Sequence, residues 1–524
     1  MKKIAIYDTT LRDGAQAEGI SFSVKDKIKI VEKLDALGVD YIEAGNPGSN
    51  PKDLEFFKSI APMELKHSKL AAFGSTRRTN KPVEEDANIQ ALLRANTPVV
   101  AIFGKSWDFH VTEIIHTTLQ ENLNMIQDTL QYLKDKGKEV IYDAEHFFDG
   151  YKHNPDYAVE TLRAAAAGGA SWLVLCDTNG GTLPLEIKEI TRKIVKEFQV
   201  PIGIHCHNDT GMAVANSFIA IQEGARQLQG TLNGYGERCG NANLCVLIPN
   251  LQLKADYYCI EDKKLKELTG ISRWVSELAN MAHDEKMPYV GNSAFAHKGG
   301  MHIDAVHKNP LSFEHIPPEV VGNERRVLMS EVAGRSTILS KIRGIDGRIH
   351  KESPETKEII ERLKSLENEG YQFEGAESSV ELMIRRKIGA HKRFFEIKDF
   401  RVLSEKPWKD DNSATAMIKV AVGDQEAVTA AEGNGPVNAL DKAIRKALEV
   451  FYPQLKNNRL TDYKVRVLDT NAATGAKVRV HIESTDGENV WGTVGVSTDI
   501  IEASFEALVD SIEYFLFREM EQEE

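Results

Sequence analysis

Two histidines separated by one residue end an apolar run, in the segment His-Cys-His-Asn-Asp at 205–209. Side chains at positions i and i+2 of a strand point to one face, so His205 and His207 can bind the same ion. Near the start of the chain, the segment Asp-Thr-Thr-Leu-Arg-Asp-Gly at 8–14 follows another apolar run. Two neutral imidazoles and the carboxylate of Asp13 suit a borderline or moderately hard divalent ion. We therefore predict a metal site at Asp13, His205 and His207 that leaves positions open for a substrate.

Each of these ligands has a simpler alternative. The two histidines could be packed or solvated side chains, and Asp13 could be a helix N-cap or a loop carboxylate. Asp8 lies nearer the strand and could instead be a buried structural acid.

An ion with open positions can chelate a 2-oxo acid through its carboxylate and ketone oxygens and polarise the ketone as a Lewis acid. Arg12 could bring a second positive charge to the oxygen that becomes an alkoxide, although a surface salt bridge would explain it equally. Glu43, at a neighbouring strand end, would orient Arg12 or cap a loop. Thr178 would hydrogen-bond the substrate carboxylate or cap the helix that follows.

Carbon–carbon bond formation next to a carbonyl also needs a base that removes a proton. Asp143 and Glu145 share one strand face and are the first candidates, and Asp143 is also a candidate for contacting the substrate. His302 follows a Gly-rich segment later in the chain and is either a base or a structural histidine. Phe73 and Phe103 end two further strands, where they would narrow the pocket toward a methyl substituent or pack in the core.

Short apolar runs alternate with longer amphipathic ones through about residue 255, and this rhythm predicts the elements that position the site. Strict alternation of strand and helix predicts a parallel sheet with right-handed crossovers, and eight units predict a closed (β/α)₈ barrel. A doubly wound open sheet is the alternative, but no Gly-rich phosphate-binding turn follows the first run. The eight runs are Lys3 to Tyr7, Val39 to Ala44, Lys69 to Phe73, Val99 to Phe103, Glu139 to Ala144, Trp172 to Cys176, Pro201 to His205 and Gln227 to Leu232.

Reactive residues of such barrels gather at the C-terminal ends of the strands. The candidate residues from Arg12 to His207 stand at such ends, so positions two hundred residues apart converge on one mouth. The polar segment at 234–241 follows the eighth run, where a phosphate-bearing ligand could approach its backbone amides. Helical patterns lie between the runs, for example Val24 to Leu37, Ala87 to Arg94, Thr117 to Lys136, Tyr157 to Ala167, Leu185 to Phe198 and Gly211 to Glu223.

The chain divides into a barrel domain over 1–270, a mainly helical accessory region over 271–393 and an α+β domain over 394–524. The accessory region includes a predicted helix over 354–369. The charged segment 394–411, which carries a proline, is interpreted as a break between domains. The α+β domain is predicted to have strands near 414–422, 427–431 and 463–469, helices over 437–452 and 500–517, and a hairpin over 476–496 turned by Asp-Gly.

Composition excludes several classes of protein. The net charge of −13 is spread over 524 residues without a long basic run, which argues against nucleic acid or an anionic membrane as the main partner. No apolar run approaches the ~20 residues of a membrane helix. The five cysteines are odd in number and irregularly spaced, so a disulfide framework is not expected and a reducing, cytoplasmic location fits best.

Three segments together closely resemble one family. Asp-Thr-Thr-Leu-Arg-Asp-Gly at 8–14, His-Cys-His-Asn-Asp at 205–209 and Gly-Glu-Arg-Cys-Gly-Asn at 236–241 are similar to those of the acyl-CoA Claisen-condensing synthases. This family includes the 2-isopropylmalate, homocitrate and citramalate synthases. The resemblance covers nearly the whole chain, and the segment at 430–439 resembles the family's C-terminal amino-acid-binding regulatory domain.

The resemblance implies a divalent metal ion (Mg, Mn or Zn) held by Asp13, His205 and His207, with Asn241 nearby or as an additional ligand. It implies that Arg12 and Thr178 bind the 2-oxo acid. It also implies that Glu145 and His302 deprotonate the acetyl group, with His302 coming from a partner subunit of a homodimer or higher homo-oligomer. Strand five departs from the Glu-Phe-Ser-Pro-Glu run common among isopropylmalate synthases, which leaves open whether Asp143 or Glu145 acts there.

Among the branches of the family, the opening segment and the segment at 143–150 are most similar to the citramalate synthases. That branch would condense acetyl-CoA with pyruvate, and isoleucine would inhibit it through the C-terminal domain. The alternatives are the same chemistry on a larger 2-oxo acid, giving 2-isopropylmalate or homocitrate, a lyase, and a non-catalytic amino-acid sensor.

Overall fold

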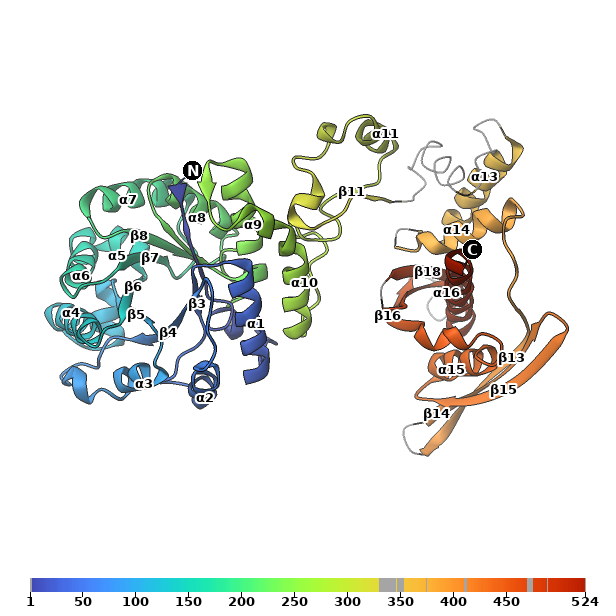
Figure 1. The fold of residues 1–524 in the computed structure, drawn as a ribbon, viewed down its shortest axis with the longest axis horizontal. Helices are drawn as coiled ribbons and strands as arrows, with labels where there is room; N and C mark the ends of the chain where they lie inside the picture. Colours follow the sequence, from blue (N-terminus) through green and yellow to red (C-terminus); the bar gives the residue numbers. More distant parts are fainter. Residues whose placement is uncertain are drawn as a thin grey trace. The chain divides into compact units, whose positions relative to one another are not determined.

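The computed structural model describes residues 2–328, 345, 353–373, 375–409, 412–468, 475–487 and 489–523. The chain divides into two compact units (Figure 1). The first consists of Met1–Phe295 and Ile316–Glu324, and the second of Ala296–His315 and Arg325–Glu524. The residues of the predicted accessory region are therefore shared between the two units.

The first unit contains a closed barrel of parallel strands in the order β2-β3-β4-β5-β6-β7-β8-β9. The first of these strands pairs with the last, which closes the sheet. The predicted (β/α)₈ barrel is confirmed, and the alternative of an open sheet is wrong. The strands are β2 Ala5–Asp8, β3 Tyr41–Glu43, β4 Lys69–Ser75, β5 Val99–Lys105, β6 Glu139–Glu145, β7 Trp172–Asp177, β8 Ile202–Cys206 and β9 Gln227–Gly230.

Helices surround this barrel (Figure 1). The first, α1 (Val24–Leu37), begins at a capping box between Ser23 and Asp26 and ends at Gly38, whose φ of 93° favours glycine. The others are α2 Pro51–Ile60, α3 Ala87–Ala95, α4 Leu119–Asp135, α5 Phe147–His153, α6 Pro155–Ala167, α7 Pro184–Glu197, α8 Ala213–Gln222, α9 Leu244–Pro249 and α10 Leu268–Leu278. Two short strands, β1 Lys2–Lys3 and β10 Tyr257–Tyr258, pair in parallel.

Alternation along each strand separates two apolar layers. On β2, Ile6 packs in the large cluster that includes helix side chains such as Leu34 and Phe56, whereas its neighbour Tyr7 belongs to a separate, smaller cluster. That smaller cluster takes side chains from several barrel strands, among them Ile141 and Val174. The middle of the barrel is therefore packed with side chains, which leaves the ends of the strands for a site.

The second unit begins with the accessory elements. They are β11 Ala296–His297, α11 Gly300–Lys308, β12 Arg326–Val327, α13 Pro354–Glu369 and α14 Glu377–Lys387. The predicted helix over 354–369 agrees with α13. Most of the accessory sequence over 329–352 lies outside the described residues.

Two three-stranded antiparallel sheets and two long helices complete the second unit. Their apolar faces share one core, in which Ile418, Leu440, Ile482 and Leu508 are buried. The predicted Asp-Gly turn lies between β17 (Val478–Thr485) and β18 (Val490–Ser497), and Gly487 has a φ of 98°. The elements are β13 Glu396–Lys409, β14 Asn412–Val422, β15 Gln425–Gly433, α15 Pro436–Leu448, β16 Arg459–Val467, β17 Val478–Thr485, β18 Val490–Ser497 and α16 Ile500–Glu523. The end of the strand predicted over 463–469 lies outside the described residues.

The segment 394–411, interpreted from the sequence as a break between domains, is mostly a strand, because β13 occupies most of it and pairs with β14. The register shifts between Ile397 and Asp399, which interrupts the period-two alternation. Phe400 and Val402 pack against the core, whereas Arg401 between them is exposed. The charged, open face of this strand made its sequence resemble a linker. Residues 410 and 411 lie outside the described part of the chain.

Among the residues that the structure describes, no helix is long and apolar enough to cross a membrane.

Candidate active site

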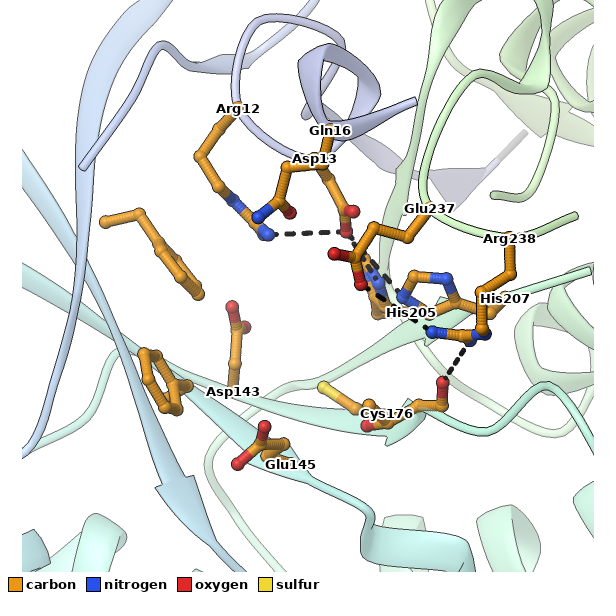
Figure 2. Close-up of a pocket in the computed structure, with 13 residues that line it drawn as sticks. Arg12, Asp13, Gln16, Asp143, Glu145, Cys176, His205, His207, Glu237 and Arg238 are labelled. Carbon is orange, nitrogen blue, oxygen red and sulfur yellow. Dashed lines mark hydrogen bonds and ion pairs between the residues drawn. The ribbon is translucent and has the colours of Figure 1, made fainter. Parts of the chain in front are cut away.

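A cavity of about 220 Å³ opens at the carboxyl ends of the barrel strands (Figure 2). Seven of the predicted site residues line it, and the chain brings them together from positions 12 to 207. The full lining is Arg12, Asp13, Gln16, Phe73, Phe103, Asp143, Glu145, Cys176, Thr178, His205, His207, Glu237 and Arg238.

Asp13 and the two histidines form a compact group of possible metal donors. Oδ2 of Asp13 lies 3.3 Å from Nε2 of His205 and 3.7 Å from Nε2 of His207, and all three side chains are buried. Donors that share an ion at about 2.1 Å each lie roughly 3 Å apart, so this group fits one ion. Asp13 precedes the short helical turn Gly14–Gln16, but its side chain makes no capping hydrogen bond there, which argues against the N-cap alternative.

The charges around this group favour binding a cation. Burial alone would raise the pKa of the Asp13 carboxyl, but Arg12 and the two imidazoles hold that pKa well below its usual range. Burial lowers the pKa of His207 to about 4, with His205 contributing. Burial acts in the same direction on His205, but its contact with Asp13 outweighs it and raises that pKa. The anionic carboxylate and the largely neutral His207 are in the states that bind metal.

Asn241 lies beside His207, because the two residues form an isolated antiparallel bridge. Its side-chain nitrogen donates to the carbonyl of Tyr235 at 3.1 Å. Its Oδ1 is buried and has no hydrogen-bond partner among the described residues. A buried oxygen without a partner is costly, so this oxygen fits an additional ligand to the ion.

Arg12 is held by Glu43 and Phe73 rather than lying in a surface salt bridge. Its Nε donates to Oε1 of Glu43 at 2.5 Å, and its guanidinium lies 3.8 Å from the ring centre of Phe73. The other oxygen of Glu43 accepts from the hydroxyl of Tyr7 at 2.6 Å. Glu43 is fully buried and makes both contacts, which fits the prediction that it orients Arg12.

The two candidate carboxylates on β6 have different surroundings. Burial, reinforced by Glu43, raises the pKa of Asp143 to about 7. Oδ1 of Asp143 accepts from Nε2 of Gln229 at 3.0 Å. Glu145, two residues further on, forms an ion pair with Lys105, its register partner on β5. The carboxyl of Asp143 thus lies beside the amide of Gln229, and that of Glu145 lies beside the ammonium of Lys105.

Thr178 lies between two loops at the mouth of the cavity. Its hydroxyl accepts from the backbone N–H of His146 at 2.8 Å, and its carbonyl accepts from Arg238 at 2.7 Å. Arg238 also forms a two-pronged ion pair with Asp209. The helix that follows begins after Leu183, so Thr178 is not its N-cap.

Phe73 and Phe103 stack on one another with ring centres 5.2 Å apart and line the cavity. Their position agrees with the proposed narrowing of the pocket. Asp8, in contrast, is fully buried and accepts from the backbone and hydroxyl of Thr10, both at 2.9 Å. This agrees with the alternative in which Asp8 shapes the loop.

His302 belongs to the second unit, on the first turn of α11, where it is exposed and stacks on Phe313 with ring centres 4.1 Å apart. The other nine predicted site residues all lie in the first unit.

Some residues of the site could not be found from the sequence. Lys105 and Gln229 contact predicted residues from neighbouring strands, and Gln16 and Cys176 line the cavity. Lys105 ends a strand one position after a glycine, a weak signal at best. Gln229 lies inside an apolar run with no signal that separates it from a packed polar side chain.

Models of known families match three consecutive parts of the chain. The model described as HMGL-like matches residues 3–275, which is more than half of the chain. Residues 289–371 match the homocitrate synthase post-HMGL domain-like model, and residues 374–516 match the LeuA allosteric (dimerisation) domain.

Full-length relatives narrow this further. The (R)-citramalate synthase of Aquifex aeolicus is 56% identical over 524 residues, which cover 99% of this chain and 99% of that protein. That of Geobacter sulfurreducens is 55% identical over 524 residues, covering 100% of this chain and 99% of that protein. The chain belongs to the (R)-citramalate synthase family. A probable 2-isopropylmalate synthase of Methanopyrus kandleri is more distant, with 32% identity over 511 residues, 97% of this chain and 98% of that protein. The resemblance seen in the sequence motifs is thereby confirmed.

Proposed function

We propose that this protein condenses acetyl-CoA with pyruvate and water to give (R)-citramalate and CoA. One feature of the site's geometry supports this reaction most directly. The cavity brings the donor group of Asp13, His205 and His207 next to Arg12 and two carboxyl groups, within a space narrowed by stacked aromatic rings. Membership of the (R)-citramalate synthase family supports the same reaction.

The chain's own residues would hold pyruvate from several sides. Arg12, fixed by Glu43, would direct its guanidinium to the ketone oxygen, where negative charge develops as the new bond forms. Thr178 would hydrogen-bond the carboxylate. Phe73 and Phe103 would face the methyl group and exclude the branched side chains of larger 2-oxo acids.

A divalent ion (Mg, Mn or Zn) would be held by Asp13, His205 and His207 with Asn241 as an additional ligand, and would act as a Lewis acid on the 2-oxo acid. We propose the ion only as one of these three metals.

Glu145 or Asp143 would remove a proton from the methyl group of acetyl-CoA, with His302 of a partner subunit assisting. The resulting carbon nucleophile forms a bond to the ketone carbon of pyruvate, and the ketone oxygen takes up a proton. Water then hydrolyses the thioester and releases CoA, which makes the overall reaction effectively irreversible. The ion pair with Lys105, which orients the carboxylate, supports Glu145 as the base of the two.

Residues 1–270 would carry out catalysis, residues 271–393 would form the accessory region and residues 394–524 would regulate the enzyme. It also includes a homodimer or higher homo-oligomer and a reducing cytoplasmic location, supported by the five free cysteines. Isoleucine would inhibit through the C-terminal domain. A cavity of about 670 Å³ beside α15 supports this, because its lining combines the ion pair of Asp441 and Arg445 with an apolar wall of Leu455 and Leu508.

Release of free thiol from acetyl-CoA tests the proposal. The purified full chain is supplied with pyruvate, 2-oxoisovalerate or 2-oxoglutarate, with and without a chelator, and again with isoleucine or leucine. We expect metal-dependent release with pyruvate that isoleucine suppresses. Preference for either larger acid would instead assign 2-isopropylmalate or homocitrate synthesis, and cleavage of citramalyl-CoA without condensation would assign a lyase. No release with any acid would leave the amino-acid sensor.

A further inference from the structure

Gln229 is a fully buried amide on β9 that the reaction above does not use. Its strand lies beside β8 in the barrel, and the register pairs its Cα with that of His205. The two side chains therefore come from adjacent strands at the same height. A buried amide needs hydrogen-bond partners for both its oxygen and its nitrogen. The partners around Gln229 therefore show which end of its amide is the oxygen.

The contacts fix which way the amide points. Its Nε2 donates to Oδ1 of Asp143 at 3.0 Å and lies 3.3 Å from Oε1 of Gln227. Both neighbours of the nitrogen are oxygens, so the nitrogen is the donor end. The amide oxygen is left facing Nδ1 of His205, at 3.1 Å.

We infer that Gln229 is a positioning residue for the metal site. Its oxygen accepts the Nδ1 proton of His205, which leaves the unprotonated Nε2 of that ring free to bind the metal. The Nε2 atom is the one that lies 3.3 Å from Asp13. A ligating histidine commonly donates its second N–H to an oxygen in this way, which fixes both the tautomer and the plane of the ring.

The two imidazoles of the site differ in this respect. Nδ1 of His207 is buried and has no hydrogen-bond partner among the described residues. The ring of His205 is thus oriented by a hydrogen bond before an ion binds, whereas the ring of His207 is oriented only by its backbone and packing. Asp143 anchors the far end of the amide, so the wall of the substrate cavity and the metal ligand share one hydrogen-bonded chain from β6 through β9 to β8.

The inference rests on the metal site of the proposed function, so its test measures metal binding in the absence of substrate. Mn²⁺ affinity of the full chain is measured by calorimetry and by electron paramagnetic resonance. Gln229→Met keeps the length of the side chain but removes its three hydrogen bonds, to His205, Asp143 and Gln227. Gln227→Met is the matched control, because Gln227 is equally buried on the same strand and touches Gln229 but not His205.

We expect Gln229→Met to weaken Mn²⁺ binding about 10- to 100-fold and Gln227→Met to change it less than about threefold. Gln229→Glu keeps an acceptor oxygen for His205, so its affinity should return to within about threefold of the unmodified protein or exceed it. Circular dichroism melting establishes that each variant is folded. If Gln229→Met does not fold, Gln229→Asn, whose amide is one methylene too short to reach, replaces it with the same expected loss.

Equal affinity of Gln229→Met and the unmodified protein would overturn the inference. Equal losses in Gln229→Met and Gln227→Met, or in Gln229→Met and Gln229→Glu, would also overturn it, because packing alone would then explain the effect. An unmodified protein that binds no Mn²⁺ but releases thiol from acetyl-CoA would overturn the metal site itself and leave the condensation intact. The two failures are therefore distinguishable.

Discussion

Glu43 places two oxygens in two different directions, one 2.5 Å from Nε of Arg12 and the other 2.6 Å from the hydroxyl of Tyr7. The carboxylate is fully buried, so neither bond competes with water. The guanidinium can therefore face the cavity in one orientation.

Replacing Glu43 with Gln tests this relationship. We expect kcat/KM for pyruvate to fall about 100-fold, because a misplaced guanidinium no longer meets the ketone oxygen. The melting temperature should also fall, because Arg12 loses its buried partner. Glu223→Gln, which breaks the exposed pair with Arg192, is the control and should leave both quantities nearly unchanged. A Glu43→Gln enzyme with unaltered kcat/KM would contradict the role of Arg12.

Enlarging the aromatic wall should change substrate preference. Phe103→Ala opens the cavity beside Phe73, so the ratio of kcat/KM for 2-oxoisovalerate to that for pyruvate should rise at least about tenfold. The ratio is measured by thiol release with both acids. Phe109→Ala, at an exposed phenylalanine that does not line the cavity, should leave the ratio unchanged. A fixed ratio in Phe103→Ala would remove the stacked pair from the account of specificity.

Removing one donor should abolish metal dependence. In His207→Ala we expect no activity that a chelator can remove, and Mn²⁺ binding too weak to detect by calorimetry. His153→Ala changes an exposed histidine and should bind Mn²⁺ as the unmodified protein does. Unchanged chelator-sensitive turnover in His207→Ala would show that the ion binds elsewhere.

Asn458 allows the proposed effector site to be tested. It lines the C-terminal cavity, is buried, and neither atom of its amide has a hydrogen-bond partner among the described residues. Asn458→Leu should raise the isoleucine concentration for half-inhibition at least about tenfold with basal activity retained, because the amide can pair with an amino-acid ligand. Asn457→Leu, on the exposed neighbour, should inhibit normally. Normal inhibition of Asn458→Leu would place the effector in another cavity.

His481 on β17 gives the C-terminal domain a predictable response to pH. Burial, followed by Arg479 and Lys464, lowers its pKa to about 4. Between about pH 6.5 and 4 the unfolded state binds a proton that the folded state does not, so the free energy of unfolding falls as pH falls.

The measurement is hydrogen exchange of peptides covering β17 in the full chain at pH 7 and pH 5. We expect local opening to become easier by about 1–2 kcal/mol beyond the intrinsic change in exchange rate. His481→Leu should remove most of that pH dependence, and peptides from β5 serve as the internal control. An identical pH dependence in His481→Leu would assign it to other groups.

Apolar periodicity was sufficient to predict the barrel, and residue type and spacing were sufficient to name the candidate metal donors at its mouth. The pair at 205 and 207 could be read from strand geometry, and Asp13 could be placed opposite it once eight strands were counted. The length of β13 could not be predicted, because a register shift and charges on its open face hide the alternation.

Contacts between adjacent strands could not be predicted from spacing either. Lys105 meets Glu145 and His205 meets Gln229 because of parallel register, which no local pattern encodes. The surroundings that separate Asp143 from Glu145 depend on these partners. Sequence alone therefore named the candidate site residues but not the side chains that contact them.

The closure of the barrel also sets an order of events during synthesis. Asp13 follows the first barrel strand, the histidines end β8, and β9 fills the gap between them by pairing with both β2 and β8. A nascent chain that has emerged through residue 226 carries Asp13, His205 and His207 but not the strand that brings them together. An ion bound at the candidate site would therefore stabilise only the finished barrel, and it would not template the early stages of co-translational folding.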